Sequence, residues 1–181
     1  MWIGALACDY DGNLAHDGKG DAPTLDALAR FKASGRKLLM VTGRELPDLA
    51  RTFEHFDLFD LIVAENGGLL LDPRSGSEEP LAPPPSDTFV RLLGERGVPL
   101  SVGRTIVATW TPHEMTVLDA IRDLGLELQV IFNKGAVMIL PTGVNKRSGL
   151  TAALERLGLS PHNVAGIGDA ENDHAFLESC H

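Results

Sequence analysis

The chain has 181 residues, which suits one domain or a core domain with a small inserted partner. Its hydrophobic fraction of 44% and charged fraction of 23% are ordinary for a globular protein and exclude a disordered chain. A net charge of −9, without a run of lysines or arginines, argues against nucleic acid as a partner.

Membrane and secretion signals are not apparent. No apolar stretch approaches the roughly 20 residues that span a bilayer, and the apolar N-terminus lacks the basic leader of a signal peptide. Cys8 and Cys180 lack the spacing of a zinc site and do not suggest a disulfide scaffold, and Cys8 reads as a buried small hydrophobe. We therefore expect a cytoplasmic protein without a membrane partner.

The first part of the chain alternates short apolar runs with helical periodicity. Apolar runs predict strands at residues 3–8, 37–41 and 61–64, and apolar spacing predicts helices at 24–34 and 46–53. Strands this apolar, in the order β-α-β-α-β, indicate a parallel sheet covered by helices on its faces. The expected fold class is therefore α/β with a Rossmann-like core.

The composition changes after this region. Five prolines between residues 72 and 85 predict a linker without secondary structure. Beyond it we expect a helix at 87–96, a strand at 105–110, a helix at 113–124 and strands at 127–132 and 136–140. The turn Asn133-Lys134-Gly135 joins the last two strands as a hairpin. Residues 73–140 are interpreted as an inserted α+β module.

The α/β rhythm then resumes. We expect a helix at 144–157 closed by Gly158, a strand at 164–167 and a helix at 170–179. The core is thus discontinuous, with residues 1–72 and 141–181 on either side of the inserted module.

Two polar segments follow the first two strands of the core. Asp9 and Asp11 can both face a crevice when the backbone turns at Gly12, as a nucleophile with an acid/base, or as solvated acids of a plain turn. Thr42 and the Gly43 N–H can hold phosphoryl oxygens, or simply cap the strand-to-helix turn.

Two further segments lie at helix starts. Lys146 in a first helical turn opposes the helix dipole, a conflict that a nearby phosphate would resolve, although an exposed lysine is the simpler reading. Asp169 is explained by helix capping alone, but Asn172 and Asp173 in the same segment are not.

These segments should meet, because open α/β sheets place ligands at the carboxyl ends of their strands. Four acidic side chains would then share one crevice and raise one another's pKa values. A hard cation with oxygen ligands relieves this repulsion, and magnesium leaves room for a substrate phosphate. The four are Asp9, Asp11, Asp169 and Asp173.

The order Asp-x-Asp, Thr, Lys and Gly-Asp-x-x-Asn-Asp resembles the haloacid dehalogenase superfamily along the whole chain. Glu65-Asn66-Gly67 after the third strand resembles its subclass IIB, the Cof-like phosphatases with an α/β cap. Residues 12–23 leave room for a short hairpin around residues 17–18 but not for a cap. The inserted module stands where that subclass carries its cap.

The resemblance implies a role for each matching residue. Asp9 attacks phosphorus and becomes an aspartyl-phosphate, and Asp11 is the general acid and base. The implied phosphate-binding residues are Thr42, Gly43, Lys146 and Asn172. The implied Mg²⁺ site consists of Asp9, the Tyr10 carbonyl, Asp11, Asp169 and Asp173. Asn13 stands where the family usually has threonine, which is expected to alter the support of the loop.

The expected partner is a small phosphorylated metabolite such as a sugar, nucleotide or cofactor phosphate. Arg104, His113 and Lys134 of the inserted module are candidates for contacting it, and Trp110 either stacks on a sugar or packs between the two parts. Two alternatives stay open. One is a phosphomutase-type phosphotransferase. The other is a regulatory phosphate-ester-binding domain of a longer protein, because relatives usually add a strand and helix beyond the last motif. The oligomeric state is left open.

Overall fold

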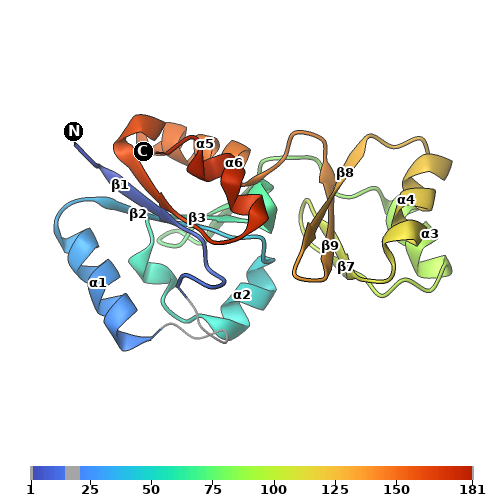
Figure 1. The fold of residues 1–181 in the computed structure, drawn as a ribbon, viewed down its shortest axis with the longest axis horizontal. Coiled ribbons are helices and arrows are strands. Elements are labelled where there is room, and N and C mark those ends of the chain that lie inside the picture. Colours follow the sequence, from blue (N-terminus) through green and yellow to red (C-terminus); the bar gives the residue numbers. More distant parts are fainter. Residues whose placement is uncertain (1, 15–20, 181) are drawn as a thin grey trace.

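The computed structural model describes residues 2–14 and 21–180, so the hairpin expected around residues 17–18 lies outside the described residues. Within these ranges the chain forms two sheets (Figure 1). The larger sheet has six strands in the order β10 (Val164–Ile167), β1 (Ala5–Cys8), β2 (Lys37–Val41), β3 (Leu61–Ala64), β4 (Leu69–Asp72) and β5 (Ser77–Pro80).

The strands β10, β1, β2 and β3 are parallel, as the sequence predicted. Four consecutive residues of β2, from Leu38 to Val41, are completely buried, because helices cover both faces of the sheet. Cys8 at the end of β1 is buried as well, and its burial and the neighbouring Asp9 raise the pKa of its thiol to about 12. The α/β fold class is confirmed.

The linker predicted across residues 72–85 is wrong in part, because β5 lies within it and pairs antiparallel with β4. All four residues of β5 are exposed at the edge of the sheet, so they carry no apolar alternation that sequence patterns could detect. The strand β4 was also not predicted from the sequence. The boundary of the inserted module at residue 73 stays a prediction, with β5 on the side of the larger sheet.

Helices cover both faces of the larger sheet (Figure 1). On one face α1 (Ala22–Ala33) and α2 (Leu46–Thr52) contribute Leu28 and Leu49 to a core with Met40. On the other face α5 (Lys146–Leu157) and α6 (His174–Leu177) contribute Leu150 and Phe176. Short 3-10 turns complete the connections at Phe56–Leu58, Glu65–Gly67, Pro161–Asn163 and Glu171–Asp173.

The second sheet is antiparallel, with strands in the order β6 (Ser101–Val102), β7 (Val107–Trp110), β9 (Ala136–Pro141) and β8 (Leu128–Asn133). The helices α3 (Asp87–Glu95) and α4 (Glu114–Asp123) pack on one face, and Figure 1 shows the other face turned toward the larger sheet. Lys134 and Gly135 have the positive φ angles of the predicted hairpin turn. We call β6–β9 with α3 and α4 the inserted module.

Among the helices of residues 2–14 and 21–180, none has both the length and the apolar composition that crossing a bilayer requires.

Two glycines bring the start of α5 close to the end of β3. A Cβ on Gly67 would lie 1.9 Å from the Asn145 carbonyl oxygen, and one on Gly149 would lie 2.6 Å from the Gly67 Cα. Because no side chain separates these segments, the first residue of α5, Lys146, reaches the edge of the sheet where the parallel strands end.

Replacing Gly67 by alanine should therefore separate α5 from the sheet. We expect Gly67→Ala to lower the free energy of unfolding by about 3 kcal/mol, measured by urea denaturation. Gly76→Ala is the matched control, because Gly76 also has a positive φ but nothing within 4 Å of its Cβ position. It should cost about 1 kcal/mol. Equal losses in the two variants would contradict the close approach.

Candidate active site

The register of the parallel strands brings two acidic segments together. Cys8 at the end of β1 lies opposite Ile167 at the end of β10, and the Asp9 N–H donates to the Ile167 carbonyl at 2.8 Å. Carboxylate oxygens of Asp9, Asp169 and Asp173 all lie within 4.8 Å of one another. The expected convergence therefore occurs for three of the four acidic residues, whereas Asp11 lies outside this group.

Lys146 is the cation at the centre of this group. Its side chain is 2% exposed, and its Nζ donates to Asp9 Oδ1 at 2.6 Å and to Asp173 Oδ1 at 2.5 Å. Asn145 caps α5 by accepting from the Ser148 N–H, which places Lys146 in the first turn. Two buried carboxylates thus offset the unfavourable position of a lysine at a helix N-terminus. The reading of Lys146 as an exposed lysine is wrong.

The Asp9 carboxyl is strongly desolvated. Burial raises its pKa above the ordinary value, Lys146 opposes this rise, and the charge of Asp173 adds to it. A nearby cation favours an ionised carboxylate, so a further positive charge at this position would help Asp9 to stay ionised.

Asp173 holds the loop that carries Asp169. Its Oδ2 accepts from the N–H groups of Asp169 and Ala170 at 3.1 and 2.9 Å, while its Oδ1 accepts from Lys146. Gly168 is needed beside it, because a Cβ there would lie 2.7 Å from the Asp173 Cβ. Asp173 therefore contributes both of its oxygens to protein contacts.

Asp169 is the exposed member of the group. Its Oδ1 accepts from Asn13 Nδ2 at 2.8 Å, and its Oδ2 lies 3.6 Å from Lys134 Nζ of the inserted module. Gly12 has a φ of 91°, and a Cβ there would lie 2.6 Å from Asp169 Oδ2. Asn13 thus supports Asp169 directly, a contact that sequence reasoning did not anticipate.

Asp11 is held by an arginine that sequence reasoning passed over. Arg44 donates to both carboxylate oxygens of Asp11, with contacts of 2.7 and 2.8 Å, and its NH1 group donates to Asp48. The guanidinium lies 5.2 Å from the centre of the Tyr10 ring. Only the adjacency of Arg44 to Gly43 in the motif after β2 could have drawn attention to it.

The residues expected to bind phosphate differ in whether they line the main cavity. Gly43 and Lys146 line the main cavity. Thr42 is completely buried, and its Oγ1 accepts from the Arg44 N–H. Asn172 donates through Nδ2 to Asn66 Oδ1 at 3.0 Å, and neither Thr42 nor Asn172 lines the cavity.

The main cavity has a volume of about 910 Å³ and is lined by residues of the larger sheet and of the inserted module. Asp9, Asp11 and Lys146 lie on the side of the larger sheet. The inserted module contributes apolar residues that we call the roof: Ile106, Ala108, Trp110, Ala136 and Met138. Polar side chains around the remaining wall include Glu45, Arg51, Ser101, Asn133 and Lys134.

Of the three candidates in the inserted module, Lys134 lines this cavity, whereas Arg104 and His113 do not. Trp110 also lines it and is 53% exposed, so it is not the packed aromatic that was one of its two expected roles.

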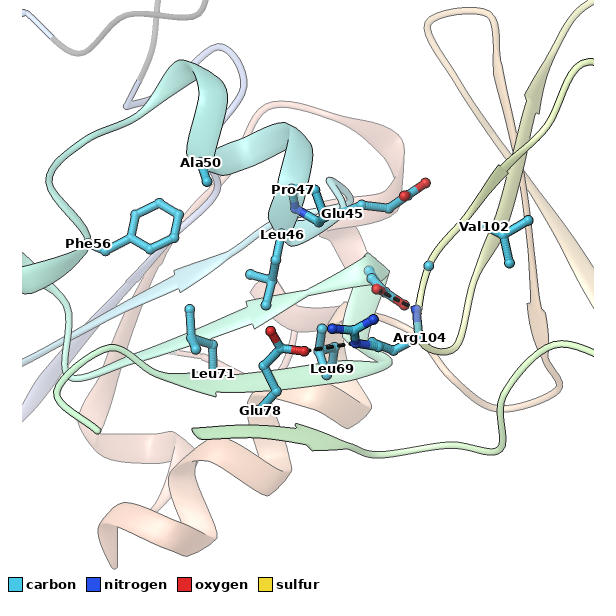
Figure 2. A pocket seen from close by; sticks show the side chains of 12 residues that line it. Glu45, Leu46, Pro47, Ala50, Phe56, Leu69, Leu71, Glu78, Val102 and Arg104 are labelled. Atoms are coloured by element: carbon cyan, nitrogen blue, oxygen red, sulfur yellow. Dashed lines mark hydrogen bonds and ion pairs between the residues drawn. The ribbon is translucent and has the colours of Figure 1, made fainter. Parts of the chain in front are cut away.

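Arg104 lies instead at a second cavity of about 320 Å³, which is shown in Figure 2. Apolar residues of α2 and β4, including Leu46, Leu69 and Leu71, form its walls. The Arg104 guanidinium forms an ion pair with Glu78 of β5 across this cavity.

Comparison with known proteins agrees with this arrangement. A sequence profile of haloacid dehalogenase-like hydrolases matches residues 6–102 and 118–181. The chain belongs to this family. A phosphoglycolate phosphatase from Methanothermobacter thermautotrophicus is 30% identical over 97% of this chain and 81% of its own length. Another from Halorubrum lacusprofundi is 29% identical over 93% of this chain and 77% of its own length.

Solved structures share the fold. A haloacid dehalogenase-like hydrolase from Bacteroides thetaiotaomicron has a TM-score of 0.81 at 15% identity and covers 99% of this chain and 86% of its own. A subclass IIB sugar phosphatase has a TM-score of 0.75 at 17% identity and covers 97% and 84%. The predicted Cof-like haloacid dehalogenase hydrolase is confirmed, and the protein is a phosphatase.

Removing the Lys146 charge should leave Asp9 and Asp173 buried without their cation. We expect Lys146→Met to lower the free energy of unfolding at pH 7, in a chelator, by about 3–5 kcal/mol. The loss should shrink as the pH falls. Lys146 lowers the pKa of Asp9, so without it the folded-state pKa rises further, and protonation of Asp9 at low pH stabilises the variant more than the wild type.

Lys134→Met is the matched control, since Lys134 and Asp169 are 62% and 42% exposed in their side chains and form a longer contact. It should change stability little. A Lys146 variant as stable as the wild type across this pH range would show that the buried contact is unimportant.

Proposed function

We propose that this phosphatase hydrolyses a small phosphate monoester with Mg²⁺, through an aspartyl-phosphate formed on Asp9. The proposal is supported above all by the position of Asp9 on the cavity wall, bonded to Lys146 and beside Asp169. A carboxylate fixed in this way can act as a nucleophile, and the neighbouring charges can neutralise a phosphoryl group.

The donor set fits a hard cation. The group consists only of carboxylates, which are the ligands that magnesium prefers, and it contains neither the thiolate nor the imidazole typical of zinc. We propose Asp9 and Asp169 as direct ligands, because Asp173 already accepts three hydrogen bonds and supports the loop from behind. The Tyr10 carbonyl stays a predicted ligand.

Asp11 is not included in the proposed metal site, although the sequence suggested it, because its carboxylate is engaged by Arg44. When bound, the ion would neutralise charge on the phosphoryl oxygens and favour ionised Asp9.

The reaction has two steps. An Asp9 oxygen bonds to phosphorus as the bond from phosphorus to the ester oxygen breaks, and Asp11 gives a proton to the leaving oxygen. Water then attacks the aspartyl-phosphate, Asp11 takes its proton, and inorganic phosphate leaves with Asp9 restored. Because Arg44 donates to both oxygens of Asp11, we propose that this contact opens when Asp11 carries and transfers the proton. We propose that Gly43 and Lys146, which line the cavity, contact the phosphoryl oxygens.

The substrate class follows from the cavity and from the relatives. Lys134 and Arg51 place two cations on the cavity wall, where the carboxylate of an anionic substrate could be bound. The relatives named phosphoglycolate phosphatases are consistent with such a substrate. We therefore propose a small phosphate ester that carries a carboxylate, with 2-phosphoglycolate as the first compound to test, and the inserted module as a cap over it.

The Asp9 assignment predicts loss of turnover without loss of fold. Asp9→Asn should lower kcat with p-nitrophenyl phosphate at least about a thousandfold, the scale of removing a nucleophile. Asp26→Asn on the exposed surface of α1 should leave it unchanged. A chelator should abolish wild-type activity and added Mg²⁺ should restore it. Full activity of Asp9→Asn, or of the chelated wild type, would reject the mechanism.

The substrate assignment predicts a selective effect of Lys134. Lys134→Ala should lower kcat/KM for 2-phosphoglycolate about tenfold, but change it little for p-nitrophenyl phosphate, which lacks a carboxylate. Equal effects on both substrates would remove Lys134 from substrate binding. Measuring released phosphate against consumed ester separates hydrolysis from the phosphotransferase alternative, in which an acceptor keeps the phosphoryl group.

A further inference from the structure

A buried carboxylate of the larger sheet binds the turn that begins β7. Glu65, directly after β3, is 1% exposed. Its Oε1 accepts from the Arg104 N–H at 2.9 Å, and its Oε2 accepts from the Thr105 N–H, the Thr105 hydroxyl and the Ile106 N–H at 2.7, 2.9 and 3.2 Å. All four donors belong to one turn of the inserted module.

The two segments are shaped for this contact. A Cβ on Gly103 would lie 2.5 Å from Glu65 Oε1, and one on Gly68 would lie 1.9 Å from the Thr105 hydroxyl oxygen. Glu65 and Asn66 have φ angles of 51° and 53°, in the left-handed region that side chains other than glycine rarely adopt. The turn at residues 65–67 is thus held in a disfavoured conformation, and the Glu65 carboxylate points into the inserted module.

The turn at residues 65–67 also contacts the segments that carry Asp169, Asp173 and Lys146. Asn66 Oδ1 accepts from Asn172 Nδ2 at 3.0 Å, in the loop that carries Asp169 and Asp173. Gly67 packs against the Asn145 carbonyl, directly before Lys146. Glu65 therefore contacts the inserted module, Asn66 the loop that carries Asp169 and Asp173, and Gly67 the start of α5.

We propose that Glu65 is a positioning residue that fixes the roof of the cavity over Asp9. The turn that it holds runs directly into Ile106 and Ala108 of the roof, so the position of the turn sets the space left for a leaving group. This deepens the proposed function, on which it rests for the identity of the cavity's occupant. Glu65 acts through the roof and touches no reacting atom.

The chain offers a matched control on the same turn. Arg104 is also tied to the larger sheet by its ion pair with Glu78, but these side chains are 63% and 36% exposed. Exposed ion pairs contribute little, whereas a buried carboxylate with several donors is costly to replace. Glu65→Gln and Glu78→Gln therefore remove the same charge from two contacts that contribute very differently to stability.

Amide hydrogen exchange measures the contact between Glu65 and its N–H donors independently of catalysis. Glu65→Gln turns an acceptor oxygen into an NH₂ group that faces N–H donors. The amides of Thr105 and Ile106 should therefore exchange at least about tenfold faster than in wild-type protein. In Glu78→Gln they should exchange as in the wild type. Unchanged protection in Glu65→Gln would overturn the proposal, even if the protein failed to hydrolyse any phosphate ester.

Kinetics then test the effect on the cavity. In Glu65→Gln, kcat/KM for p-nitrophenyl phosphate should fall at least about tenfold, because its bulky leaving group would need the roof in place. For acetyl phosphate, whose leaving group is smaller, kcat/KM should fall less than about threefold. A smaller folded fraction would lower both values equally and leave their ratio unchanged, so equal losses contradict the positioning role.

If Glu65→Gln does not fold, Gly103→Ala tests the same contact from the other side, because its new Cβ would press on the Glu65 carboxylate. It should change the ratio of the two kcat/KM values in the same direction. A ratio equal to that of the wild type in Gly103→Ala would count against the proposal.

Discussion

The structure depends on one buried contact, in which Lys146 lies between Asp9 and Asp173. Two carboxylates and one ammonium are taken out of water together, and removing any one of them would leave a costly unpaired buried charge. Asp9 follows β1, Asp173 lies in the loop after β10, and Lys146 begins α5, so the contact requires these three elements to be assembled together. Gly67 and Gly149 have no side chains, and this allows α5 to pack closely against the end of β3.

The contact leaves an excess of negative charge beside the cavity. Asp169 adds a third carboxylate to the group, and the only ammonium within hydrogen-bond distance of Asp9 and Asp173 among the described residues is Lys146. Lys134 lies 3.6 Å from Asp169, so a divalent cation would turn the remaining negative charge into a positive one, and a phosphoryl group would be attracted to the site. The cationic side chains Arg44, Arg51 and Lys134 line the cavity, so an anionic substrate also meets positive charge there.

Much of the core could be predicted because its strands are continuous apolar runs, and the central strands β2 and β3 are buried on both faces. The strands at 37–41, 61–64 and 164–167 have the bounds that the sequence predicted, since continuous apolar runs end abruptly at polar motifs. The strand β5 was missed because its exposed residues include two glutamates and a proline. Edge strands of this kind are stabilised by pairing with a neighbour, and the neighbour is not visible in a local pattern.

The same distinction applies to the site. The convergence of Asp9, Asp169 and Asp173 follows from strand order, because parallel strands end at one edge. The engagement of Asp11 by Arg44, and of Asp169 by Asn13, depends on side-chain directions in loops, which spacing along the sequence does not determine. Likewise, only the position of the hairpin between β8 and β9 in space brings Lys134 to Asp169 while His113 lies away from the cavity.

The central claim is that Asp9 is the phosphorylated residue and shares a metal ion with Asp169. It is tested most directly by a crystal structure of the protein with Mg²⁺ and beryllium fluoride, which mimics a phosphoryl group on a carboxylate. We predict beryllium bonded to an Asp9 oxygen, with the magnesium ion in contact with both Asp9 and Asp169 and Lys146 still beside Asp9. Beryllium on another residue, or magnesium bound away from Asp169, would contradict the account.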